Sequence, residues 1–382
     1  MKIAVPKEMT PGERRVALTP DAIAGLVKSK LDVLVETGAG DGAFHRDEAF
    51  TQAGARIVPD AAALYSQADL VTKVQKPTLD EVDQLREGTV LVSFLQALTA
   101  TDLVQRLVTR RITSFGMEGI PRISRAQKMD ALSSQANIAG YKAVLIAAES
   151  LAKFFPMMMT AAGTVFAARV LVIGAGVAGL QALATARRLG AQVWGYDVRP
   201  VVKEQVESLG AKFLEFDLSL TDAEDKGGYA KALTADTSRR QQELLNEKSK
   251  DFDVIITTAL VPGKPAPRLI TKETVAGMRP GAVIIDLAAE AGGNCELTEP
   301  DHVVVKHGVT IHGPTNLPAA MPVHASQLYA RNVTELLREF VKDGALALQL
   351  DDEIVKSACV THNGTIVNEA VAAAAAAARR SV

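Results

Sequence analysis

A glycine-rich stretch in the middle of the chain is the clearest candidate for chemistry. The apolar run RVLVI ends at a turn that contains Gly174, Gly176 and Gly179, and a helical pattern and a second apolar run, QVWGY, follow it. In such a unit the first glycine permits a tight turn, the second lets the backbone approach a pyrophosphate, and the third allows close helix packing. The first amide groups of the helix face the same pyrophosphate. The stretch therefore predicts a dinucleotide site.

The charged residues after the second run indicate which dinucleotide binds. Asp197 lies 18 residues after Gly179, at a place where a carboxylate binds the ribose hydroxyls and repels a 2′-phosphate. Arg199 offers the alternative, since an arginine beside the ribose can pair with that phosphate. We give the carboxylate more weight, so the pattern favours NAD(H) over NADP(H).

No general acid or base is evident elsewhere in the sequence. A dehydrogenase of amino acids or hydroxy acids needs a His or Lys beside the reacting carbon. Of the six histidines, His302, His307 and His312 lack metal-ligand spacing and lie on or near predicted strands, so we expect them to be structural. A second GAG, at residues 38–40, lacks the glycine at the sixth position of the motif and predicts only a βα turn.

Two series of strand and helix patterns position these residues. The first ends near residue 117, and the second begins at Arg169 with RVLVIG and continues to HVVVKHG. Alternation of this kind is typical of βαβ units around mostly parallel sheets. We predict an α/β protein with two Rossmann-like doubly wound domains, a cleft between them, and long helices that join them. The expected domains are residues 1–131 with returning C-terminal helices 321–382, and an NAD(H)-binding domain at 132–320.

Four segments outside the two series have their own predictions. Residues 117–155 predict a polar loop and then a long connecting helix, and residues 372–378 predict a terminal helix. Residues 227–251 are longer and more polar than an ordinary connection, which predicts a mobile loop that leads into a helix. Residues 157–159, three methionines, are expected in the core; the alternative is that the run MMMTAAG and the C-terminal helices contribute an apolar dimer interface.

Composition excludes several classes of function. Lys and Arg number 42 against 44 Asp and Glu, a net charge of −2, so nucleic acid is not an expected partner. Two cysteines in 382 residues indicate neither a disulfide framework nor a zinc site and fit a reducing cytosol. Charges, Gly or Pro interrupt every long apolar stretch before about 20 residues, and the N-terminus lacks a signal-peptide pattern. We expect neither a membrane span nor export.

Several motifs together resemble one family over essentially the whole chain. They are KIAVPKE with RRVALTP, PRISRAQKMDALSSQANIAGYKAV, VIGAGVAG with GYDVR, GGYAK, and TTALVPGKPAP with AAEAGGN. These motifs resemble the NAD(H)-binding component, domain I, of proton-translocating nicotinamide nucleotide transhydrogenase. The resemblance implies that hydride passes from NADH to NADP⁺ held by a partner protein. It places Gln127 toward the nicotinamide ribose of that NADP(H), and Arg122, Asp130 and Ser133 toward the carboxamide of the dihydronicotinamide.

The same resemblance implies a set of NAD(H) contacts in the second domain. These positions lie on the glycine turn, at the acidic strand end, on the mobile loop that closes over the nucleotide, in the adenine pocket and at a further strand end. They are Gly174, Ala175, Gly176, Val177, Gly179, Asp197, Val198, Arg199, Gly228, Tyr229, Gln241, Ala259 and Leu260.

Partners and location are also implied by the resemblance. An NADP(H)-binding component, the beta subunit, would dock on the loop that carries Arg122, and a membrane-spanning component would translocate protons. A second copy would complete a homodimer. The chain stops at Val382 without a predicted membrane span, so it resembles the separate alpha-1 subunit type. That type is expected to be cytoplasmic and peripheral on the inner face of the plasma membrane.

Alanine dehydrogenase, a relative with the same architecture, is the alternative. That family has a catalytic His in the segment that matches SFLQALT, where this chain has Gln96, and an Asp in the segment that matches DLAAEAGGN, where this chain has residues 289–291, AEA. Arg15, Lys73 and Lys76 do match its pattern, and the sequence leaves two alternatives for them, inherited scaffold or ion pairs near the cleft. Hydride transfer between two nicotinamide C4 atoms moves no proton to or from oxygen or nitrogen. The missing His therefore agrees with a transhydrogenase.

Overall fold

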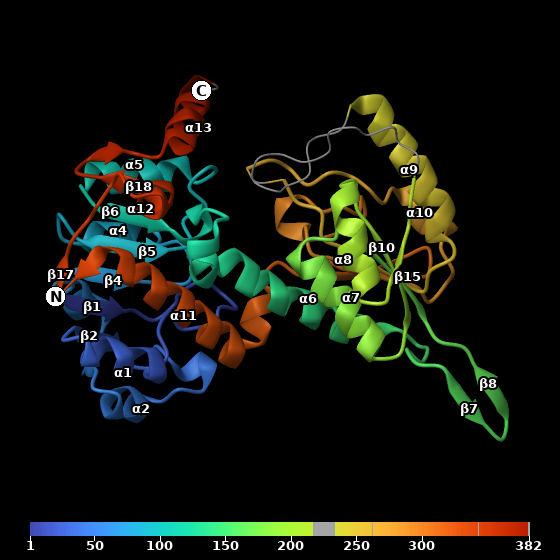
Figure 1. Ribbon diagram of the computed structural model, residues 1–382, viewed down its shortest axis with the longest axis horizontal. Helices are drawn as coiled ribbons and strands as arrows, with labels where there is room; N and C mark the ends of the chain where they lie inside the picture. Colours follow the sequence, from blue (N-terminus) through green and yellow to red (C-terminus); the bar gives the residue numbers. More distant parts are fainter. Residues whose placement is uncertain (217–233, 262, 343, 381–382) are drawn as a thin grey trace. The chain divides into compact units, whose positions relative to one another are not determined.

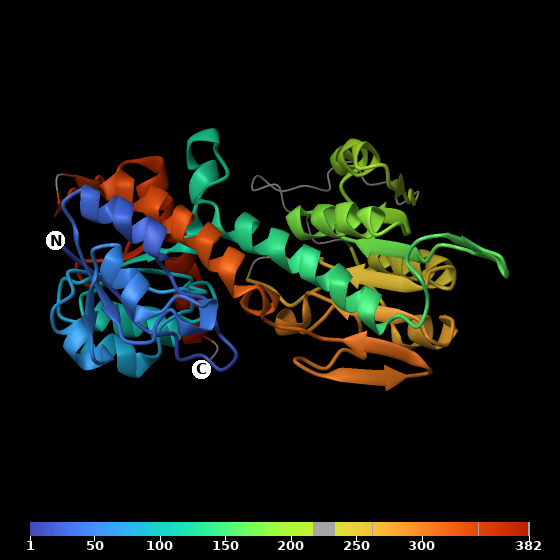
Figure 2. The ribbon, with the colours of Figure 1, turned by 90° about the horizontal axis from the view of Figure 1, so that it is seen from below.

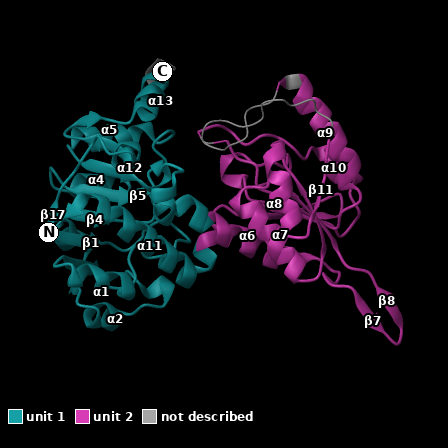
Figure 3. Cartoon of the chain, viewed as in Figure 1, with its two compact units in different colours: residues 1–135, 319–382 teal, residues 136–318 magenta. Residues whose placement is uncertain are grey.

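The chain forms two compact units, one of residues 1–135 with 319–382 and one of residues 136–318 (Figure 3). The computed structural model describes residues 1–216, 234–261, 263–342 and 344–380. The chain passes from one unit to the other within helix α6 (Ala131–Ser150) and returns within the short 3-10 helix η6 (Leu317–Ala320). Each unit contains one main sheet, and the expected α/β class with parallel sheets is confirmed.

Unit 1 is built on an eight-stranded sheet with the order β19-β18-β6-β5-β4-β1-β2-β3 (Figure 1). The first six strands of the chain pair in parallel. They are β1 (Lys2–Val5), β2 (Asp32–Glu36), β3 (Arg56–Val58), β4 (Leu70–Thr72), β5 (Val90–Ser93) and β6 (Thr113–Gly116). Strands covered on both faces are apolar at nearly every position, which is why most of these segments are short runs rich in Val, Ile and Leu in the sequence.

Helices cover both faces of this sheet. Neighbouring strand residues face opposite ways, so Ile3 lies in one hydrophobic core and Ala4 in the other. In the first core, Phe340 of α11 stacks on Phe115 of β6, with the ring centroids 4.4 Å apart. The helices of unit 1 are α1 (Pro20–Lys28), α2 (Asp47–Gln52), α3 (Ala61–Tyr65), α4 (Leu79–Gln84), α5 (Thr101–Thr109), α11 (Pro322–Phe340), α12 (Glu353–Ala358) and α13 (Glu369–Arg380).

The C-terminal segment also contains strands that its helical pattern did not predict. β18 (Cys359–His362) joins the main sheet antiparallel to β6, and β19 (Thr365–Ile366) pairs with β18. β16 (Val341–Lys342) and β17 (Ala345–Leu346) form a separate two-stranded ribbon. The pairing of β18 depends on a strand more than two hundred residues earlier, and local periodicity carries no information about such a partner.

Unit 2 contains a seven-stranded sheet with the order β11-β10-β9-β12-β13-β15-β14. From the central β9 the chain moves outward through β10 and β11, and then returns to the other side of β9 with β12. Sheets of this kind bind ligands at the carboxyl ends of the two strands where the order reverses, here β9 and β12. The strands are β9 (Arg169–Ile173), β10 (Gln192–Tyr196), β11 (Lys212–Phe213), β12 (Val254–Thr257), β13 (Val283–Asp286), β14 (Val303–Lys306) and β15 (Val309–His312).

The helices of unit 2 follow its strands in the expected alternation. α7 (Val177–Arg188) connects β9 to β10, and α8 (Lys203–Ser208) connects β10 to β11. α9 (Ala235–Ser249) precedes β12, and α10 (Lys272–Gly277) precedes β13. No helix within the described ranges of either unit combines the length and the hydropathy that a bilayer crossing needs.

Two predicted strands of unit 2 differ in detail from the sequence pattern. The AKFLEF run forms only the two-residue β11, and HVVVKHG forms β14 and a turn into β15. β14 pairs antiparallel with β15 at the edge of the sheet. His307 adopts a positive φ of 52° in that turn. The polar end of the HVVVKHG run therefore forms the turn between β14 and β15.

The three methionines at 157–159 lie outside the core, contrary to expectation. β7 (Met158–Thr160) and β8 (Gly163–Val165) form an antiparallel hairpin that extends away from the rest of unit 2 (Figure 1, Figure 2). Met157 is 56% exposed and Met159 is 78% exposed. A short apolar run has the same pattern in a buried strand and in an exposed ribbon, so the sequence did not separate them.

Candidate functional site

The turn after β9 has the geometry that its glycines require. Gly174 adopts a φ of +99°, and a Cβ there would lie 2.5 Å from Oγ1 of Thr258. A Cβ on Gly179 would lie 1.8 Å from the carbonyl oxygen of Gly174. Beyond its chain neighbours, no described atom lies within 4 Å of the position that a Cβ of Gly176 would occupy. The space over Gly176 is therefore open at the N-terminus of α7, as a bound pyrophosphate requires.

Asp197 is tied to this turn by its carboxylate. Its Oδ2 accepts a hydrogen bond from the amide of Ala175 at 2.8 Å. Nε and Nη2 of Arg199 donate to Oδ1 and Oδ2 at 3.0 and 2.9 Å. The pair is largely buried, and the arginine charge is directed at the carboxylate. This arrangement opposes a role for Arg199 in holding a 2′-phosphate. Val198 lies between the two and is half-buried.

Gln241 reaches the end of β10 from α9. Its Nε2 donates to the phenolic oxygen of Tyr196 at 2.9 Å, and both side chains are buried. Burial raises the pKa of Tyr196 to about 12, so the phenol stays neutral. Gln241 thus lies beside the strand that leads to Asp197. The other two predicted contacts, Gly228 and Tyr229, lie outside the described residues.

The chain after β12 is fixed by a buried asparagine. Oδ1 of Asn294 accepts from the amide of Ala259 at 3.0 Å, and Nδ2 donates to the carbonyl of Ala259 at 2.9 Å. The hydroxyl of Thr258 donates to the carbonyl of Gly174 at 2.9 Å. The bond from Thr258 joins the ends of β9 and β12. Leu260 follows with 46% of its surface exposed.

Sequence reasoning assigned no role to Asn294, Thr258, Asp286 or Gly140. Asp286 ends β13, and its fully buried carboxylate accepts hydrogen bonds from two hydroxyls and two amides. Its signal was an acid directly after the apolar run AVII, the same position that Asp197 holds after β10. A Cβ on Gly140 of α6 would lie 2.1 Å from the carbonyl oxygen of Ala178, so this glycine lets α6 approach α7.

The predicted catalytic residues lie on one continuous segment of unit 1. The 3-10 helix η3 (Ser124–Met129) leads into α6. Arg122 and Gln127 are exposed. Asp130 precedes α6 and accepts hydrogen bonds from the amide and the hydroxyl of Ser133, at 2.8 and 2.6 Å. The structure therefore brings Asp130 and Ser133 into contact as a helix N-cap, a pattern that the spacing of the two residues carries in the sequence.

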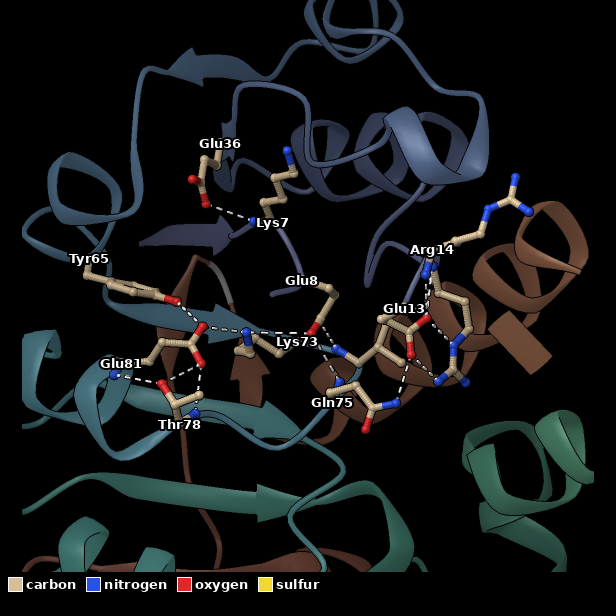
Figure 4. Close-up of polar contacts among 12 residues, drawn as sticks. Lys7, Glu8, Glu13, Arg14, Glu36, Tyr65, Lys73, Gln75, Thr78 and Glu81 are labelled. Carbon is tan, nitrogen blue, oxygen red and sulfur yellow. Dashed lines mark hydrogen bonds and ion pairs between the residues drawn. The ribbon is translucent and has the colours of Figure 1, made fainter. Parts of the chain in front are cut away.

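A buried ionic cluster lies at the carboxyl ends of the unit 1 strands (Figure 4). Nζ of Lys73 lies 2.6 Å from Glu81 and 3.5 Å from Glu8, and the hydroxyl of Tyr65 donates to Glu81. Burial raises the pKa of Glu8 against the attraction of Lys73. Burial also opposes ionisation of Glu81, but the charge of Lys73 and the hydrogen bonds that Glu81 accepts together outweigh it, so the pKa of Glu81 is lowered.

The other residues shared with the alanine dehydrogenase pattern also have partners within unit 1. Arg15 forms an ion pair with Glu13 at 2.6 Å. Nζ of Lys76 donates to Oε1 of Gln96 at 2.8 Å. Gln96 has a φ of 52° in a turn whose neighbouring amides donate to the buried carboxylate of Glu118. The polar groups of this region are therefore extensively paired with each other.

Both units match known family descriptions. Residues 4–139 match "Alanine dehydrogenase/PNT, N-terminal domain", and residues 143–369 match "Alanine dehydrogenase/PNT, C-terminal domain". The chain is 54% identical to a protein of Rhodospirillum rubrum that is named as a part of "NAD(P) transhydrogenase subunit alpha", over 97% of this chain and 99% of that protein. It is 32% identical to "Alanine dehydrogenase 2" of Staphylococcus aureus, over 87% and 85%.

Solved structures show the same two similarities. A transhydrogenase from Sinorhizobium meliloti superimposes with a TM-score of 0.85 at 42% identity, covering 97% of this chain and all of that one. An L-alanine dehydrogenase superimposes with a TM-score of 0.81 at 28% identity, covering 98% and 99%. The similarity in both cases extends over both units.

Proposed function

The chain belongs to the alanine dehydrogenase/PNT family, and we propose that it is the NAD(H)-binding subunit of a proton-translocating NAD(P) transhydrogenase. The observation that carries this proposal is the 54% identity to a transhydrogenase alpha subunit over 97% of the chain. That span includes the glycine turn of unit 2 and the segment 122–133 of unit 1. The alanine dehydrogenase relative is more distant, at 32%.

Unit 2 provides the NAD(H) site in this proposal. The open space over Gly176 and the amide groups at the start of α7 suit a pyrophosphate. Asp197 contacts the adenosine ribose in this proposal, and its pairing with Arg199 supports selection of NAD(H) over NADP(H). The remaining contacts are Gly174, Ala175, Val177, Gly179, Val198, Gly228, Tyr229, Gln241, Ala259 and Leu260.

The segment 122–133 serves hydride transfer. NADH supplies a hydride from C4, with both electrons, to C4 of NADP⁺; one nicotinamide is oxidised, the other is reduced, and no proton is exchanged with water. The protein must hold the two rings about 3 to 3.5 Å apart and exclude solvent. Gln127 orients the nicotinamide ribose of the partner's NADP(H). Arg122, Asp130 and Ser133 orient the carboxamide of the dihydronicotinamide, Asp130 through acceptor sites beyond those used by Ser133.

Two other components complete the proposed enzyme. An NADP(H)-binding component, the beta subunit, docks on the exposed segment around Arg122 and Gln127. A membrane-spanning component translocates protons, coupled to the hydride transfer. The subunit then resides on the inner face of the plasma membrane as a peripheral protein.

The β7–β8 hairpin is the surface we assign to a homodimer. Residues 154–168 contain no charged side chain, and Met157, Met159 and Phe166 are exposed on them. A second copy offers the same uncharged surface, and a two-fold axis makes such a patch self-complementary. Phe166→Glu is expected to convert the dimer to a monomer in sedimentation equilibrium. A dimer that persists in this variant would place the interface elsewhere.

An alanine dehydrogenase is the competing function, favoured by the structural similarity at a TM-score of 0.81. Gln96 cannot transfer a proton in place of a histidine. Arg15 and Lys73 are held in ion pairs with Glu13, Glu8 and Glu81, which oppose their use as free cations for a substrate carboxylate.

Reconstitution distinguishes the two functions. The purified chain is mixed with its cognate NADP(H)-binding component, NADH and the thionicotinamide analogue of NADP⁺, whose reduced form absorbs at its own wavelength. L-alanine with NAD⁺ is assayed in parallel with the chain alone. The proposal predicts reduction of the analogue only when both proteins are present, and no oxidation of alanine. Oxidation of alanine by the chain alone would contradict it.

A further inference from the structure

The segment that carries Gln127 has little support of its own. η3 is a 3-10 helix of six residues, and such helices have poorer hydrogen-bond geometry than α-helices. Only Ala126 and Met129 of η3 are buried, in the core below it. Gln127 and Lys128 are exposed. Side chains from other elements must therefore fix where Gln127 lies.

Asn332 of α11 supplies one such support. It is 7% exposed, and its Nδ2 donates to the carbonyl oxygen of Lys128 at 2.8 Å. Its Oδ1 accepts from the hydroxyl of Ser134 at 2.7 Å. One carboxamide thus joins the last turn of η3 to the first turn of α6, on either side of Asp130.

Arg125 supplies a second support at the other end of η3. Its Nη1 donates to Oε2 of Glu339 on α11 at 2.9 Å, and its Nη2 donates to Oδ2 of Asp352 at 2.6 Å. Asp352 is also the N-cap of α12. Arg125 is half exposed, so each ion pair contributes little to stability. Two partners on separate elements nevertheless restrict the direction of the guanidinium.

We propose that Asn332 is a positioning residue for hydride transfer: by bonding to both Lys128 and Ser134 from α11, it fixes Gln127 relative to Asp130 and Ser133. This inference rests on the proposed function and deepens it. Bonds to the backbone of η3 on one side and to α6 on the other set the spacing between the residues that face NADP(H) and those that face NADH. A displacement of about 1 Å in such a spacing lowers a rate by about 100-fold.

The test measures hydride transfer by Asn332→Ala in the reconstituted complex of this chain with its NADP(H)-binding component. We expect kcat to fall at least about tenfold, while the Kd for NADH of the isolated chain stays within about twofold of the wild-type value. Thr334→Ala is the matched control, because its hydroxyl donates to the carbonyl of Ala330 within the same helix. We expect that control to retain the wild-type kcat.

Ser134→Ala provides a milder second variant that keeps the bond from Asn332 to Lys128. It is expected to lower kcat less than Asn332→Ala, and the double variant is expected to be no slower than Asn332→Ala alone, because both changes break the same link. Thermal unfolding of each variant, measured in parallel, shows how much of the sample is folded.

The outcomes separate this inference from the proposed function. If Gln127→Asn is slow but Asn332→Ala retains the wild-type kcat per folded molecule, Asn332 is only structural and the inference is wrong. The inference is also wrong if Asn332→Ala lowers the unfolding temperature but leaves kcat per folded molecule unchanged. If Gln127→Asn also transfers hydride at the wild-type rate, the proposed role of the whole segment fails. Slow transfer with unchanged NADH affinity in both variants supports the inference and the proposed function together.

Discussion

The dinucleotide turn of unit 2 and the segment 122–133 of unit 1 are built in different ways. The turn is made of backbone: Gly174 and Gly179 occupy positions where a Cβ would meet other atoms at 2.5 Å or less. The segment presents side chains, with Arg122 and Gln127 exposed, and it is held by contacts with α11, two hundred residues later in the chain. A site made of backbone tolerates almost no substitution, whereas a site made of side chains is adjusted from a distance.

Gly179→Ala is expected to have the largest effect, because its Cβ would overlap the carbonyl oxygen of Gly174. Overpacking at such a contact destabilises by about 3 kcal/mol, and the turn cannot keep its shape. Chemical denaturation should show the lower free energy of unfolding, and NADH titration should show no binding. A variant with wild-type stability would mean that the turn is not rigid.

Gln127→Asn is expected to separate transfer from binding. The exposed carboxamide is shortened by one methylene and loses its reach toward the second nucleotide, so hydride transfer should slow about 100-fold. NADH affinity should change little, because the glycine turn provides that binding. Stopped-flow transfer and equilibrium titration measure the two quantities on one sample. An equal loss of both would place Gln127 in the NADH site instead.

Gly176→Ala is the counterpart of Gly179→Ala within the same turn. Its Cβ would enter open space, so the free energy of unfolding should stay within about 0.5 kcal/mol of the wild-type value. The same methyl group would occupy space that a pyrophosphate needs, and the Kd for NADH should rise at least about tenfold. Unchanged NADH affinity would show that the pyrophosphate does not bind at this position.

Asp197→Asn is expected to have the smallest effect of the four. The substitution keeps the shape but releases Arg199 from its ion pair, so NADPH should bind better relative to NADH by about tenfold. Competitive titration of the two nucleotides measures the ratio. An unchanged ratio would show that discrimination lies at another residue.

The same contrast explains which parts of the structure could be predicted from the sequence. The strand, glycines, helix and Asp197 lie within thirty residues, so local pattern and chain geometry specify the turn together. The alternation of apolar runs likewise predicted two α/β series, since β9, β10, β12 and β13 are apolar along most of their length.

The parts that the sequence did not predict depend on distant contacts or on solvent exposure. β18 becomes a strand because β6 offers an edge, and the 157–159 methionines are exposed because their hairpin leaves the sheet. Neither condition is visible in a local pattern. The ion pairs of Arg15 and Lys73 were open alternatives until the positions of Glu13, Glu8 and Glu81 were known.

The central claim is that hydride passes directly from one nicotinamide to the other, with this chain holding the donor. The most direct measurement uses NADH that carries deuterium at the transferred C4 position, mixed with the chain, its NADP(H)-binding component and NADP⁺. Mass spectrometry of the product NADPH then locates the label. Direct transfer predicts that the deuterium is retained at C4 of NADPH and that none appears without both proteins. Loss of the label to water would contradict direct transfer.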